Sequence, residues 1–66
     1  MINGKVIRAA RGLVGWSQGE LARRSGVSIN TVVRFEHSNP IAAARVETLK
    51  RVTDALEAGG VKVVGK

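Results

Sequence analysis

The chain has 66 residues, enough for one small domain, and its 11 Lys and Arg against 5 Asp and Glu give a formal net charge of +6. It has no cysteine and a single histidine, which excludes disulfides, thiolate metal sites and a zinc site built from this chain alone. The charge surplus favours a polyanionic partner, nucleic acid or an anionic membrane surface, although a basic solvated surface gives the same count.

The N-terminal stretch MINGKVIRAARGLVGW is interrupted by three basic residues, Lys5, Arg8 and Arg11. A signal peptide and a transmembrane helix both need an uninterrupted apolar segment, so the sequence predicts neither. We therefore expect no association with a membrane and a cytoplasmic location.

The first predicted helix runs from Gly4 to Val14, with Asn3 as its N-cap and Gly15 at its end. Its inward apolar stripe consists of Ile7, Ala10 and Val14.

The second predicted helix covers about residues 18–25. Ser17 and Glu20 have the S-x-x-E spacing of a capping box, which indicates a helix start, and Gly26 follows as the turn residue.

The third predicted helix covers about residues 29–37, with Ser28 as N-cap and with Val32 and Phe35 pointing inward. Residues 38–43 are predicted to form a loop, because Pro40 disfavours helical geometry at the residue before it. The last helix is predicted over about residues 44–58, before two glycines.

The C-terminal stretch VKVV, residues 61–64, is predicted to form a short β-strand with no second strand in the chain to pair with. A lone strand has unpaired backbone groups, so we expect it to pair with a second copy as an antiparallel ribbon. The alternative is that this tail packs back on its own domain.

Three residues, one in the second helix, one in the turn and one in the third helix, have the spacing of a helix-turn-helix, a unit that places one helix in the major groove of DNA. Ala22 is small enough for the two helices to approach closely. Gly26 can adopt the positive φ of a sharp turn, and Val32 fills the angle between the helices.

The run SQGELARRSGVSINTVVRFE resembles the Cro/C1-type (XRE) helix-turn-helix domains of phage repressors and bacterial transcription regulators, over about residues 5–58. The resemblance implies an all-α fold, a compact four-helix domain of the lambda-repressor type at residues 1–60, with the short β-strand at residues 61–66 as a dimer contact. It implies a transcriptional regulator at the nucleoid that binds operator half-sites in the major groove of double-stranded DNA as a homodimer.

The resemblance also implies roles for individual residues. Asn30 can bond adenine bidentately, Arg34 can bond guanine or a phosphate, and Ile29 can contact a thymine methyl. The base-facing set is Ser28, Ile29, Asn30 and Arg34. The phosphate-binding set is Ser17, Gln18, Thr31, His37 and Arg45.

Arg11 and Glu36 match an ion pair of this family that ties the first helix to the end of the third. A free carboxylate on a helix that faces DNA would repel phosphate, so pairing with Arg11 is the better interpretation of Glu36. The alternative is two exposed charges that contribute little to stability.

Two features depart from the family pattern. The loop sequence HSNPIAAA has no basic residue before Arg45, and Ile29 and Val33 put apolar side chains on or near the recognition face. They support a second hypothesis, an antitoxin or anti-activator whose helix-turn-helix binds a protein partner. The sequence has no paired carboxylates at a credible site, no nucleophile beside a base and no P-loop, so we expect no enzyme activity, catalytic residue, metal or cofactor.

Overall fold

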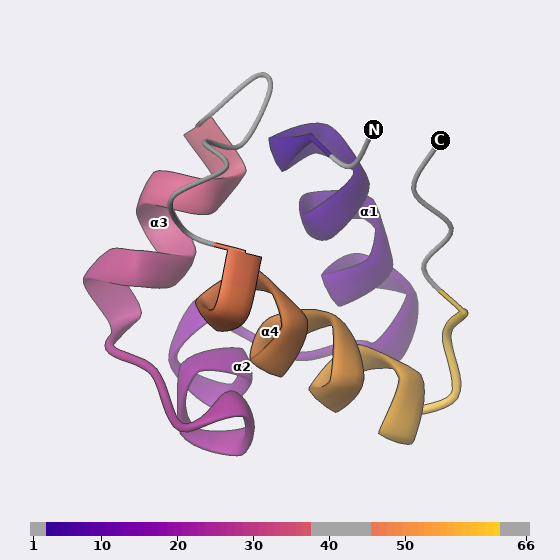
Figure 1. Cartoon of the computed structure of the whole chain (residues 1–66). Coiled ribbons are helices and arrows are strands. Elements are labelled where there is room, and N and C mark those ends of the chain that lie inside the picture. Colours follow the sequence, from indigo (N-terminus) through magenta and orange to yellow (C-terminus); the bar gives the residue numbers. More distant parts are fainter. Residues whose placement is uncertain (1–2, 38–45, 63–66) are drawn as a thin grey trace.

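The structure is a computed structural model and describes residues 3–37 and 46–62. The helices in this part of the chain are α1 (Gly4–Val14), α2 (Gln18–Ser25), α3 (Ile29–His37) and α4 (Val46–Ala58). Figure 1 shows α3 at the left of the molecule, and α4 runs from the centre to the lower right. The predicted loop at residues 38–43 and the first two residues of the predicted last helix lie outside the described residues.

The hydrophobic core takes side chains from every one of these helices, because each helix is amphipathic. The buried apolar residues are Ile7 and Ala10 of α1, Leu21 and Ala22 of α2, Val32 and Phe35 of α3, and Val52 and Leu56 of α4. Half-buried side chains that pack against this core are Val14, Trp16, Val27, Leu49, Ala55 and Val61.

The helix starts follow from local hydrogen bonds. The side chains of Asn3, Ser17 and Ser28 each accept a hydrogen bond from the backbone N–H three residues later, at 3.1, 3.0 and 3.2 Å. Each bond satisfies a backbone donor that the first helical turn leaves unpaired. These polar residues therefore fix where α1, α2 and α3 begin.

The turn between α2 and α3 depends on a left-handed residue. Gly26 has φ 73°, a conformation that a residue with a Cβ rarely adopts. The N–H of Val27 then donates to the carbonyl of Ala22 at 3.1 Å, and the N–H of Gly26 donates to the carbonyl of Arg23 at 3.4 Å. This pair of bonds is a Schellman motif, and it turns the chain from α2 into α3.

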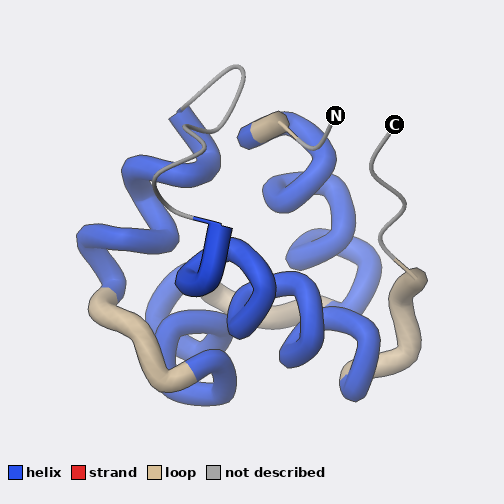
Figure 2. The backbone as a smooth tube through the Cα atoms, viewed as in Figure 1, coloured by secondary structure: helices blue, strands red, loops and turns tan. Residues whose placement is uncertain are grey.

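The prediction of a C-terminal β-strand is wrong: no strand is present in residues 3–37 and 46–62, and Figure 2 shows only helix and loop there. The N–H of Val61 donates to the carbonyl of Leu56 at 3.2 Å, and that of Gly60 to the carbonyl of Glu57 at 3.0 Å. Val61 therefore caps α4, and its side chain packs on the core. The ribbon between two copies loses its basis, while Val63 and Val64 lie outside the described residues.

The described helices are not suited to span a membrane. None of them combines enough residues with enough apolar character to cross a bilayer.

Candidate nucleic-acid interface

The outward face of α3 carries the residues that the sequence predicts to face DNA bases. Val32 and Phe35 are buried on the opposite face, which fixes the rotation of the helix. The structure exposes all four predicted base-facing side chains, Ser28, Ile29, Asn30 and Arg34. Asn30 and Arg34 are four residues apart and so lie one above the other on the helix surface.

Apolar character on this face is concentrated at one residue. The Ile29 side chain is 50% exposed, whereas Val33 is half-buried. Gly19 of α2 lies beside Ile29, because a Cβ built on Gly19 would sit 3.8 Å from the Ile29 Cδ1 atom. The start of α3 therefore presents one apolar side chain among polar neighbours.

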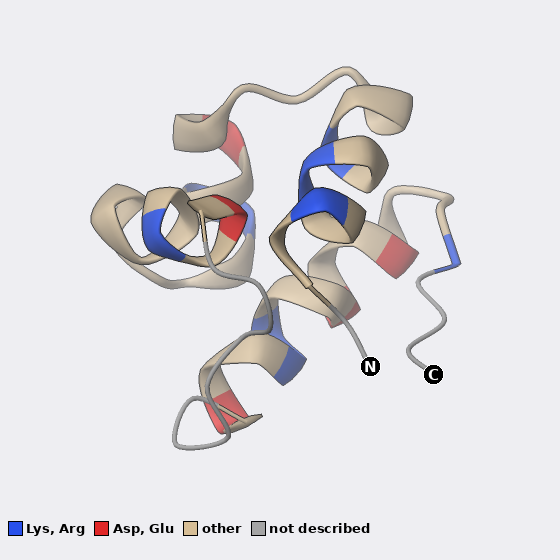
Figure 3. Cartoon of the chain, turned by 90° about the horizontal axis from the view of Figure 1, so that it is seen from above, with Lys and Arg blue, Asp and Glu red and all other residues tan. Residues whose placement is uncertain are grey.

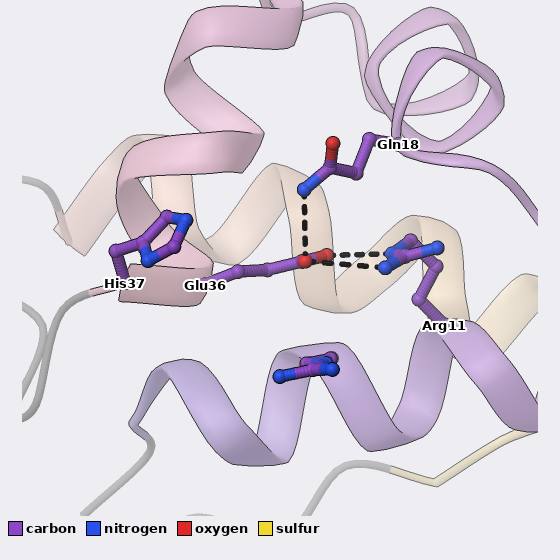
Figure 4. Close-up of a pocket in the computed structure, with 5 residues that line it drawn as sticks. Arg11, Gln18, Glu36 and His37 are labelled. Atoms are coloured by element: carbon purple, nitrogen blue, oxygen red, sulfur yellow. Dashed lines mark hydrogen bonds and ion pairs between the residues drawn. The ribbon is translucent and has the colours of Figure 1, made fainter.

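A hydrogen-bonded network joins α1, α2 and the C-terminal end of α3 (Figure 4). Arg11 Nε lies 2.6 Å from Glu36 Oε2, and Arg11 Nη2 lies 3.2 Å from Glu36 Oε1. Gln18 Nε2 donates to the same Oε1 at 3.0 Å. The Glu36 side chain is 4% exposed and that of Arg11 is 20% exposed, so this is a largely buried, bidentate ion pair.

Arg11 also reaches the connection between α1 and α2, since its Nη1 donates to the carbonyl of Trp16 at 2.9 Å. One guanidinium thus holds the end of α1, the approach to α2 and the last turn of α3. Both oxygens of Glu36 are occupied, so its charge is compensated inside the protein and opposes a nearby phosphate less.

The predicted phosphate contacts occupy different environments. Gln18 is the first residue of α2, and one of its two amide hydrogens is used by Glu36. Ser17 is exposed and caps α2, and the Thr31 hydroxyl lies 2.9 Å from the Ser28 hydroxyl. Arg45 lies outside the described residues.

A pocket of about 350 Å³ adjoins the network and is lined by Arg8, Arg11, Gln18, Glu36 and His37. It brings His37, at the end of α3, close to the start of α2. The sequence interpretation assigned no role to Arg8 in this site. The signal was nonetheless present, because Arg8 and Arg11 are three residues apart and so share one face of α1.

The cations at the end of α2 are engaged elsewhere. Arg23 and Arg24 contact the Glu20 carboxylate at 2.6 and 2.5 Å. Hydrogen bonds from Arg23 and then from Arg24 lower the pKa of Glu20 below its ordinary value of 4.5. Arg24 also stacks over Trp16, 4.5 Å from the ring centroid. Gly59, just after α4, approaches the same ring, because a Cβ built on Gly59 would lie 2.7 Å from the Trp16 Cη2 atom.

Charge is distributed unevenly over the helices (Figure 3). Helix α1 carries three basic residues and no acidic residue, whereas α2, α3 and α4 each carry both signs. Of the described helices, α1 is therefore the most uniformly positive, and it forms one side of the pocket.

The described residues contain no group of three or more His, Cys, Asp or Glu side chains placed to bind a metal ion.

Comparison with known proteins gives one positive result. A family model described as helix-turn-helix matches residues 7–59, which is most of the chain and includes α2, the turn and α3. Searches of curated proteins and of solved structures found no match. The match agrees with the capped helices, the left-handed Gly26 turn and the exposed face of α3, so the chain belongs to the Cro/C1-type helix-turn-helix family of DNA-binding transcription regulators.

Proposed function

We propose that this protein is a sequence-specific regulator that binds operator half-sites by inserting α3 into the major groove of double-stranded DNA. The observation that carries the proposal is the exposed face of α3, with the polar side chains of Asn30 and Arg34, on a helix whose other face is buried. A helix of this kind on a helix-turn-helix scaffold is the standard way to present side chains to base edges.

The chemistry of the exposed side chains defines their roles. The Asn30 amide matches the N6 and N7 edge of adenine, and the Arg34 guanidinium matches O6 and N7 of guanine. Ile29, half exposed, suits a thymine methyl group. Phosphate contacts from Ser17, Gln18, Thr31, His37 and Arg45 would fix the register of α3 on the duplex.

We include homodimerisation in the proposal, because a single α3 contacts too few base pairs to select one site. Two copies would place their α3 helices in successive major grooves, about 34–36 Å apart. The dimer does not depend on the C-terminal ribbon. Sedimentation with and without DNA measures whether the two copies associate before or upon binding.

The most direct test is selection of bound sites from a random pool of duplex DNA. We expect a palindromic site with half-sites separated by one helical turn. Recovery of no enriched sequence would contradict sequence-specific binding.

Substitution of Arg34 tests the orientation of α3. We expect Arg34→Ala to weaken binding to the selected site by about 10- to 100-fold, the equivalent of one lost bidentate base contact. Arg51→Ala removes the same charge from an exposed position of α4 and is the control. Equal effects of the two substitutions would show that Arg34 contributes charge alone.

The exposed Ile29 supports a second candidate, an antitoxin or anti-activator that binds a protein through α3. An apolar side chain on an exposed helix face is a typical anchor for a helix-binding groove. The two functions differ in their response to Ile29→Ser. Loss of a co-purifying protein with unchanged DNA binding favours the protein partner, and altered preference at a thymine position favours DNA.

A further inference from the structure

We propose that the pocket between α1, α2 and α3 binds one backbone phosphate of the DNA, and that Arg8 supplies its main charge. We call it the Arg8 pocket, defined by Arg8, Arg11, Gln18, Glu36 and His37. The inference rests on the proposed function and adds to it a phosphate site with a residue that the family resemblance does not assign.

The charges inside the Arg8 pocket leave one guanidinium uncompensated. Arg11 and Glu36 neutralise each other at 2.6 Å, and Gln18 donates to the same carboxylate. Arg8 is exposed, and within residues 3–37 and 46–62 it forms no hydrogen bond or ion pair. The net charge of the pocket is therefore that of Arg8, and His37 adds a ring N–H as a hydrogen-bond donor.

Four other cations of the described structure differ from Arg8 in this respect. Ion pairs to carboxylates engage Arg11, Arg23, Arg24 and Lys50. Arg8 cannot pair within its own helix, because α1 contains no acidic residue. A free guanidinium at the mouth of a pocket is a strong donor for an oxyanion, and its planar fork matches phosphate geometry.

The position of the pocket selects a DNA phosphate over other anions. It is bounded by the first residue of α2 and the last residue of α3, and these elements belong to the proposed DNA-binding face. A phosphodiester there can accept from Arg8 on one side and from His37 or the remaining Gln18 amide hydrogen on the other. Since the sequence has no basic residue between His37 and Arg45, α1 would supply a backbone clamp that the following loop lacks.

The salt dependence of DNA binding tests this contact. Each phosphate neutralised contributes about 0.9 to the slope of log affinity against log salt. With the duplex recovered by selection, we expect Arg8→Gln to lower the slope by about 0.9 and to weaken affinity about fivefold at 0.15 M salt. Arg8→Lys keeps the charge and should restore most of the slope.

The matched control is Arg51→Gln, which removes an arginine that is also exposed but lies on α4, outside the pocket. It should leave the slope unchanged. Thermal unfolding of each variant checks that the fold is retained. If Arg8→Gln keeps the wild-type slope, the phosphate site is overturned. The proposed function still stands in that case, because the wild-type protein binds the duplex. A wild-type protein without salt-dependent binding overturns both.

Free phosphate is the other source of the same chemistry, and NMR separates the two. Inorganic phosphate added without DNA should give weak, non-saturating shifts at Arg8 and His37, whereas the duplex should shift both at stoichiometric amounts. Saturation by inorganic phosphate together with an unchanged DNA salt slope in Arg8→Gln would assign the pocket to a small anion and overturn the proposal.

Discussion

At the residue scale, Glu36 makes the polar interactions that tie α3 to α1 and α2. Its carboxylate accepts from Arg11 twice and from Gln18 once, and only 4% of its side chain is exposed. Neutralising this group leaves a partly buried guanidinium without its counter-ion. The cost of such a change is set by the desolvated charge that remains.

We expect Glu36→Gln to lower the free energy of unfolding by about 3 kcal/mol in urea denaturation. The control is Lys50→Gln, which breaks a pair whose side chains are 73% and 58% exposed. That change should cost less than about 1 kcal/mol, because solvent screens an exposed pair. A loss at Glu36 no larger than at Lys50 would mean that the network adds little to stability.

Single residues also mark the limit of sequence interpretation in the site. The pairing of Arg11 with Glu36 could be expected because a family pattern and the repulsion of phosphate agree on it. The sequence did not predict the hydrogen bond from Gln18 to Glu36, or that Arg8 and His37 line one pocket. They depend on how α1 and α3 cross, and no local rule links residues so far apart in the chain.

At the element scale, the N-terminus of α1 lies very close to the last turn of α3. A Cβ on Gly4 would overlap the backbone carbonyl oxygens of Phe35 and Glu36. Gly4 is buried there, so the two helix ends can meet only if this residue has no side chain.

We expect Gly4→Ala to lower the free energy of unfolding by about 1–3 kcal/mol, because backbone atoms must move to make room. Gly12→Ala in the same helix is the matched control, since nothing lies within 4 Å of a Cβ there. That substitution should raise the free energy of unfolding by about 0.5–1 kcal/mol through helix propensity. Urea denaturation of both variants gives the comparison, and stabilisation by both would contradict the close approach.

Helix positions were largely predictable because their signals are local. The bounds of α1, α2 and α3 follow from Asn3, Ser17 and Ser28 at their starts and from glycines after α1 and α2. The cap that Val61 forms on α4 was not predictable, because an apolar, branched residue is equally typical of a strand, which the sequence wrongly indicated here. Only its hydrogen bond to Leu56 and its packing on the core distinguish the two.

At the scale of the whole molecule, a small core limits the stability. Eight buried apolar residues hold the described helices together, and a domain of this length is expected to have an unfolding free energy of only about 3–10 kcal/mol. Any ligand that binds only the folded state therefore has a visible effect on the melting temperature.

We expect the selected duplex, at about 100 times its Kd, to stabilise the protein by about 2.7 kcal/mol. For a domain of this size the melting temperature should rise by roughly 10–20 °C. Circular dichroism at increasing DNA concentration measures the shift, and a scrambled duplex is the control. An equal shift with both duplexes would argue for binding through charge alone.

The position of Trp16 gives this protein an intrinsic optical reporter. It is the single tryptophan of the chain, it lies under the Arg24 guanidinium, and Gly59 at the end of α4 approaches its ring. Its emission should therefore respond when α4 leaves the helix-turn-helix, because the indole then loses the cover of Gly59, whereas Arg24 belongs to α2 and stays beside it. Stopped-flow fluorescence of the unlabelled protein could follow that separation in real time, and Arg24→Gln, which removes the cation over the ring, shows how much of the signal depends on that cation.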